Sequence, residues 1–85
     1  MIVTTPDWLA QHEGELRPNR DGQSYTVYIG AQPQYVLIPV PARGQHACRV
    51  SMTVNGRRLD GPGTYPTTAD AVRGGLEDLR KALGW

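Results

Sequence analysis

Three stretches in the middle of the chain have the side-chain patterns that predict β-strands. Residues 24–29 alternate, with apolar side chains at positions 25, 27 and 29. Residues 34–40 are apolar at nearly every position, which is typical of a strand covered on both faces. Residues 47–54 show the cleanest alternation, because positions 48, 50, 52 and 54 are all apolar. We therefore expect three consecutive strands, preceded by a loop at residues 17–23.

Prolines limit the pairing of the second strand. Pro33, Pro39 and Pro41 all occupy odd positions, and the odd residues of a strand present their backbone N–H groups to the same side. Proline has no N–H to donate, so that side cannot carry a full ladder of hydrogen bonds beyond residue 38. The strand is expected either to end there or to lie at an open edge of the sheet.

A tight turn is predicted directly after the third strand. Asn55-Gly56 is the strongest short signal for a hairpin, because both residues tolerate the positive φ angles of a type I′ turn. A short returning strand is expected at residues 57–59, before the Gly-Pro-Gly sequence at 61–63 breaks it.

Two helices are predicted, one near each end of the chain. The first spans residues 5–13, with Thr5 as N-cap, Pro6 at the first helical position and Gly14 as the stop. The second begins after Thr67, an N-cap with Asp70 three residues later, and runs to a cap at Gly84. Its apolar side chains recur at the helical spacing and form one stripe, at positions 72, 76, 79 and 83.

Two adjacent glycines interrupt the second predicted helix. Each costs about 1 kcal/mol relative to alanine in a helix interior. Gly75 borders the apolar stripe, so a close approach of the helix to the sheet would explain it. The pattern offers no explanation for Gly74.

The order of elements is α-β-β-β-(β)-α, and it predicts an α+β fold. We expect an antiparallel meander of three to four strands with the helices packed on one face. The chain has 85 residues, which is the length of a single domain, and we assign residues 1–85 to one. It has no phenylalanine, so the core is expected to be thin and association with another chain would add to it.

Composition and charge exclude several classes of function. Nine Lys and Arg nearly balance eight Asp and Glu, which argues against a general binder of polyanions. No stretch approaches the roughly 18 apolar residues of a membrane span, and the first residues do not resemble a signal peptide. One cysteine excludes an internal disulfide. We therefore expect a cytoplasmic protein that does not contact membranes.

No combination of residues predicts catalysis, a metal or a cofactor. Cys48 occupies the inward register of its strand and is expected to be buried and inert. His12 and His46 are 34 residues apart and lack the spacing of metal ligands. We predict that the protein is not an enzyme.

The distribution of charge indicates where an interaction would occur. Residues 22–59 contain no acidic residue but four arginines. This predicts an electropositive outer face on the sheet, and a basic face with an aromatic side chain can bind nucleic acid or an acidic protein. The candidate interaction residues are Arg43, His46, Arg49, Arg57, Arg58 and Tyr28.

The order of motifs in the second half of the chain supports a resemblance. The alternating strand at 50–54, Asn55-Gly56 with Arg57 and Arg58, the Gly-Thr-Tyr sequence at 63–65, and the helix entry at 68–71 resemble plant ethylene-response factors and phage integrase arms. These DNA-binding domains have a three-stranded sheet and a helix. The resemblance implies that Arg49, Arg57 and Arg58 contact DNA. The chain also resembles double-stranded-RNA-binding domains in its order of elements, although the lysine cluster of that family is absent at 67–72.

Two functions remain open at this point. The first is a small non-enzymatic domain that binds a protein partner or forms a homodimer, and the near-neutral charge, the thin core and the open strand edge favour it. The alternative is DNA binding through the basic face of the sheet.

Overall fold

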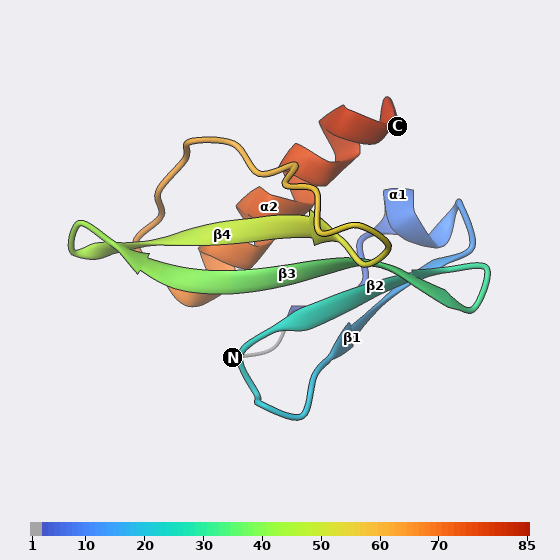
Figure 1. Cartoon of the computed structure of the whole chain (residues 1–85), viewed down its shortest axis with the longest axis horizontal. Coiled ribbons are helices and arrows are strands. Elements are labelled where there is room, and N and C mark those ends of the chain that lie inside the picture. Colours follow the sequence, from blue (N-terminus) through green and yellow to red (C-terminus); the bar gives the residue numbers. More distant parts are fainter. Residues whose placement is uncertain (1–2) are drawn as a thin grey trace.

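The computed structural model describes residues 3–85 and has an α+β architecture (Figure 1). Four antiparallel strands form one sheet in the order of the chain, β1-β2-β3-β4, as predicted for a meander. A long helix, α2, lies on one face of the sheet, and a short helix, α1, precedes it in the chain. The elements are α1 (Asp7–Ala10), β1 (Gly14–Pro18), β2 (Tyr25–Ile29), β3 (Gln32–Ala42), β4 (Gln45–Met52) and α2 (Thr68–Leu83).

One of the four strands, β1, was not predicted from the sequence. Gly14 was expected to stop a helix and residues 17–23 to form a loop, but residues 14–18 pair with β2 in a register that places Leu16 opposite Val27. The strand has one apolar side chain between charged neighbours and is bounded by Gly14 and Pro18. It is therefore specified by its pairing with β2 and not by a local pattern.

The first helix is shorter than predicted and is capped differently. It spans only Asp7–Ala10, and Pro6 occupies the N-cap position that we assigned to Thr5. The Thr5 hydroxyl instead accepts a hydrogen bond from the backbone N–H of Leu16, at 3.0 Å. Thr5 thus ties the segment before α1 to β1.

The turn after β4 is not the predicted two-residue hairpin. Gly56 has a positive φ of 71°, but Asn55 does not, so the turn is not type I′. The Met52 carbonyl accepts from the N–H of Gly56 at 2.9 Å, which closes a wider turn. The strand therefore ends at Met52, and the predicted return at 57–59 consists of one isolated bridge between Ser51 and Arg58.

The prolines of β3 act as predicted on one side of the strand. β3 pairs with β2 only as far as Leu37, opposite Tyr25, whereas its pairing with β4 continues to Ala42. The side that faces β2 carries no ladder beyond residue 38, as expected. The strand does not end there, because its other side remains fully paired with β4.

The core lies between α2 and the inner face of the sheet. Its fully buried side chains include Val27, Leu37 and Val50 from the strands and Val72 and Leu79 from α2. Leu9 of α1 is also fully buried, and a β-carbon on Gly14 would overlap it. Gly14 is therefore required by packing and not by a helix stop.

The predicted caps of α2 are confirmed. The Thr67 hydroxyl accepts from the N–H of Asp70 at 3.1 Å, and Gly84 adopts the left-handed conformation as C-cap. The next residue, Trp85, stacks on His12, with ring centroids 3.9 Å apart, and meets the edge of Trp8 at 6.3 Å. These aromatic contacts fasten the end of α2 to α1.

Both glycines of α2 are explained by close packing. A β-carbon on Gly75 would lie 2.5 Å from the sulfur of Cys48 on β4, so the predicted close approach to the sheet is confirmed. A β-carbon on Gly74 would overlap the ring of Tyr65, which comes from the segment between β4 and α2. Gly75 therefore allows β4 to pack closely against the helix, and Gly74 allows the connecting segment to do so.

We predict that Gly75→Ala destabilises the protein by about 1–3 kcal/mol, because the added methyl group must displace Cys48 and β4. The same change in an exposed helix interior would stabilise by about 1 kcal/mol. Urea denaturation of the single variants and of the double variant with Cys48→Ala measures the coupling. The double variant should recover part of the loss, and a Gly75→Ala protein as stable as the wild type would contradict this packing.

Candidate functional site

The face of the sheet opposite α2 is not covered by any element between residues 3 and 85 (Figure 1). Leu37 and Val50 point toward α2 and are buried, so their neighbours along each strand point to the opposite, outer face. On β3 these neighbours are Val36, Ile38 and Val40, which we name the outer ridge. Ile38 is 39% exposed, and the two valines are half-buried.

Arg49 lies beside the outer ridge, as predicted for the sheet face. The register of β3 and β4 pairs it with Ile38, and it is exposed. Arg49 makes no ion pair with any residue from 3 to 85. The centre of the outer face therefore combines an apolar strip with one uncompensated positive charge.

Tyr28 lies on the same face but in a different cluster. The Arg17 guanidinium lies over its ring, 4.6 Å from the centroid, and also pairs with Glu15 at 2.9 Å. The hydrogen bond from Arg17 lowers the pKa of Glu15, and the same bond raises the pKa of Arg17. The charges of this cluster are thus internally balanced. Arg17 and Glu15 were not predicted as site residues, because they lie on β1, which no local pattern predicts.

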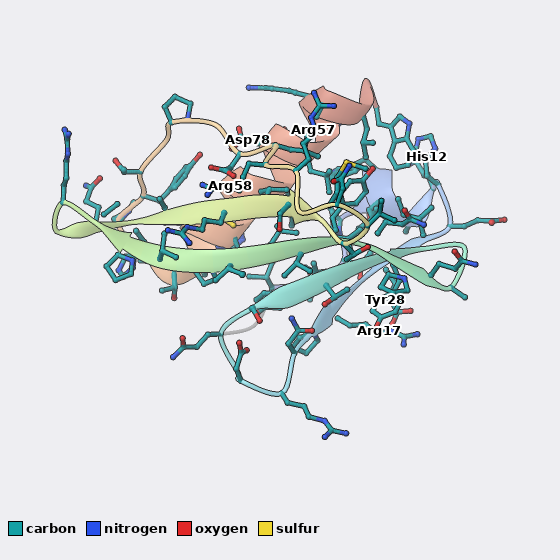
Figure 2. All side chains as sticks on the ribbon, in the orientation of Figure 1. His12, Arg17, Tyr28, Arg57, Arg58 and Asp78 are labelled. Atoms are coloured by element: carbon teal, nitrogen blue, oxygen red, sulfur yellow. The ribbon has the colours of Figure 1, made fainter. Side chains whose placement is uncertain are left out.

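Arg57 and Arg58 do not join Arg49 in one free basic patch. Arg58 donates two hydrogen bonds to the Asp60 carboxylate, one of them from Nη2 to Oδ2 at 2.8 Å. Asp60 also accepts a hydrogen bond from the backbone N–H of Val50 at 3.2 Å. Arg57 lies in the turn, where its N–H donates to the Asn55 side chain. Figure 2 shows Arg58 beside β4 and Arg57 higher in the view, over α2, both away from Tyr28. Arg58 has a structural role in holding the return segment against β4.

Arg43 and His46 lie at the other end of the β3–β4 hairpin. Arg43 occupies the turn between the two strands, with a positive φ of 50°, and Arg49 lies six residues later in the chain, in the middle of β4. His46 is half-buried, and its backbone exchanges two hydrogen bonds with Tyr65, of 2.9 and 2.7 Å. The six predicted residues therefore fall in separate places on the sheet.

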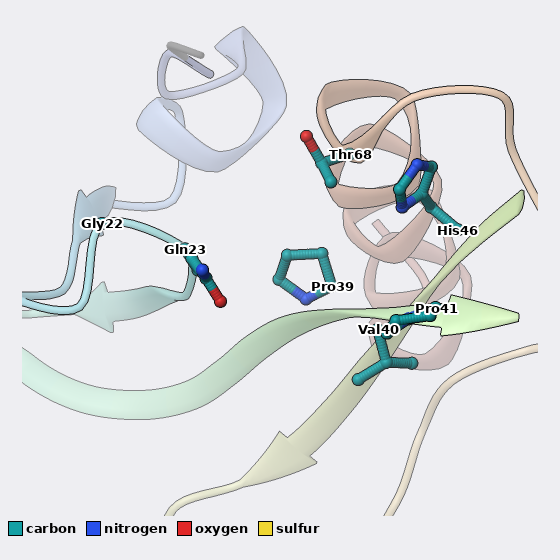
Figure 3. A pocket seen from close by; sticks show the side chains of 7 residues that line it. All are labelled: Gly22, Gln23, Pro39, Val40, Pro41, His46 and Thr68. Carbon is teal, nitrogen blue, oxygen red and sulfur yellow. The ribbon is translucent and has the colours of Figure 1, made fainter.

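His46 also lines a groove of about 350 Å³ that the sequence analysis did not identify (Figure 3). The groove lies where the β3–β4 hairpin extends past the end of β2, below the first turn of α2. Its lining residues are Gly22, Gln23, Pro39, Val40, Pro41, His46 and Thr68. The odd-numbered prolines were the available signal, because they mark where β2 can no longer pair with β3.

Cys48 is buried beneath α2, as predicted from its register. Burial raises the pKa of its thiol to about 12, and the negative charges of Asp60 and Asp78 add to the effect. The reactive thiolate is therefore scarce at neutral pH. Residues 3–85 contain no group of three His, Cys, Asp or Glu side chains placed to hold a metal ion, and none of their helices is long and apolar enough to span a membrane.

Comparison with known proteins adds no assignment: no family model matches the chain, and neither curated proteins nor solved structures give a significant match.

We predict that Asp60→Asn destabilises the protein by about 1 kcal/mol at pH 7 and by less at pH 3. The hydrogen bond from Arg58 lowers the pKa of Asp60, so the carboxylate stabilises the fold above its unfolded pKa of about 4. That contribution is lost as the pH falls through the lowered value in the folded protein.

Urea denaturation at the two pH values measures the difference. Glu13→Gln is the control, because Glu13 is exposed and forms no ion pair with residues 3–85. A deficit of Asp60→Asn that is equal at both pH values would show that the charge of Asp60 contributes nothing.

Proposed function

We propose that the protein is a non-enzymatic interaction domain whose outer ridge binds a protein partner. The observation that carries the proposal is the apolar strip of Val36, Ile38 and Val40 on a sheet face that no described element covers. Exposed apolar strips with a polar rim are typical of protein interfaces. The absence of a disulfide in so small a domain supports a cytoplasmic location for this function.

The charges around the ridge favour an acidic partner over a second copy of the chain. β2, β3 and β4 carry no carboxylate, and Glu15 on β1 is already paired with Arg17. Two copies packed face to face would bring Arg49 toward another positive face without an acid to meet it. A partner with carboxylates beside an apolar surface would complement both the ridge and Arg49.

DNA binding remains the alternative, and the arrangement of arginines favours it less. Sheet faces that bind DNA use several basic side chains for phosphates and base edges. Here Arg58 is paired with Asp60 and Arg17 with Glu15, whereas Arg49 forms no ion pair with residues 3–85. Arg43 and Arg57 form none with these residues either, but they lie in the turns before and after β4. The side chains of the outer ridge beside Arg49 have no polar group that could bind a phosphate.

We predict that Ile38→Asp lowers the affinity for the partner by at least about tenfold, because it places a charge in the apolar contact. Val54→Asp is the matched control, since Val54 is 83% exposed on the turn after β4, outside the ridge. Both variants and the wild type serve as bait in extracts of the source cells. The retained protein is identified, purified and titrated by calorimetry.

Arg49→Glu should weaken the same complex, whereas Arg20→Glu in the β1–β2 loop should not. Equal affinity of the partner for all variants would overturn the proposal. Two further measurements test the alternatives. A dimer that is detected by light scattering and dissociated by Ile38→Asp would make a second copy of the chain the partner. Salt-dependent retention of a random-sequence DNA duplex that needs Arg49 would favour DNA binding.

A further inference from the structure

The second half of β3 has an open backbone edge. The N–H and carbonyl of Val50 bond outward, to Asp60 and Leu59, so its partner Leu37 directs its own backbone groups toward β2. The same parity holds for Pro39 and Pro41. β2 ends at Tyr25, opposite Leu37, and no strand formed by residues 3–85 pairs with this edge beyond that point.

This edge presents acceptors without donors. Proline has no N–H, so Pro39 and Pro41 offer only their carbonyl groups, two residues or about 7 Å apart. The register would bring Gln23 opposite Pro39 if β2 continued. Instead the N–H groups of Gln23 and Ser24 both donate to Asp21, at 2.9 Å, and turn the β1–β2 loop away. The space between this loop and the edge is the groove of about 350 Å³.

We infer that this groove accepts a short extended segment of the partner as an additional strand beside β3. The inference rests on the proposed function, because it specifies how the partner binds. Successive inward-facing N–H groups of an extended segment are also about 7 Å apart, so two of them match the carbonyls of Pro39 and Pro41. The segment would occupy the line along which β2 would have continued.

The surroundings of the edge define the side chains of that segment. The proline rings and His46 form a floor suited to small apolar side chains (Figure 3). Arg43, in the adjoining turn, forms no ion pair with residues 3–85 and would pair with a carboxylate of the segment. Val40 belongs to both the groove and the outer ridge, so an added strand would widen the ridge by one row.

A second copy of this edge is a poor occupant. Two β3 edges placed side by side would oppose carbonyl to carbonyl at each proline, and neither copy could donate there. Prolines on exposed strands have this blocking effect in general. The hydrogen-bonding pattern and the acid-free sheet therefore both favour a segment of a different protein.

The experiment uses a phage-displayed library of random linear nonapeptides, selected on the full-length protein. The best peptide is synthesised and titrated against the wild type, Gln23→Trp and Arg20→Trp. Gln23 is exposed and uses only its backbone N–H in a hydrogen bond, so the indole fills the groove without breaking a contact. Arg20 lies in the same loop outside the groove and is the matched control.

We expect enrichment of extended sequences with an acidic residue and at least a tenfold loss of affinity with Gln23→Trp but not with Arg20→Trp. Methylation of alternate peptide amides should abolish binding in one register and leave it within about threefold in the other, because only one set faces the carbonyls. This second test needs no protein variant. Failure to enrich any peptide, or indifference to Gln23→Trp or to methylation, would overturn the inference.

The outcome also separates the inference from the proposed function. The affinity of the purified partner could be lowered by Ile38→Asp but not by Gln23→Trp. That result would support the outer ridge as the interface and show that the groove is not part of it. Sensitivity to Gln23→Trp alone would establish the groove as a peptide site and refute the role of the ridge.

Discussion

The close contact of α2 with β4 is the constraint on which the rest of the structure depends. Gly75 brings the helix backbone onto Cys48, and Gly74 makes room for the ring of Tyr65. Tyr65 in turn bonds to His46 through the backbone, so helix, strand and connecting segment meet within one helical turn. The cost of two glycines in a helix interior, about 1 kcal/mol each, is offset by this dense packing in a core without phenylalanine.

The position of α2 determines which surface remains for interaction. One long helix covers the inner face of β3 and β4, and α1 with its aromatic contacts completes the cover near β1. Residues 3–85 contain no second helix of comparable length for the outer face. The outer ridge and the open edge of β3 are therefore direct consequences of the topology, and they adjoin at Val40.

Local patterns predicted the elements that carry their own signals. The alternation in 24–29 and 47–54, the cap of α2 by Thr67 and the one-sided effect of Pro39 and Pro41 all follow from residues close in sequence, although β4 ends at Met52. β1 was not predicted, because its pairing with β2 specifies it. The role of Thr5 was not predicted either, because its hydroxyl accepts a hydrogen bond from a residue eleven positions away. Of the candidate surface, the outward position of Arg49 could be predicted from strand parity. The ion pair of Arg58 with Asp60 could not, because it depends on the path of the return segment.

The outer surface combines an exposed apolar strip with two features that oppose self-association. An uncovered sheet face and an open strand edge ordinarily lead to aggregation between copies. Here the edge lacks donors at Pro39 and Pro41, and the β2–β4 face lacks any acid that would attract its own Arg49. Neither feature opposes a chain that brings its own N–H groups and carboxylates. The same residues that oppose contact between copies are compatible with a different and acidic partner, which is the property that the proposed function requires.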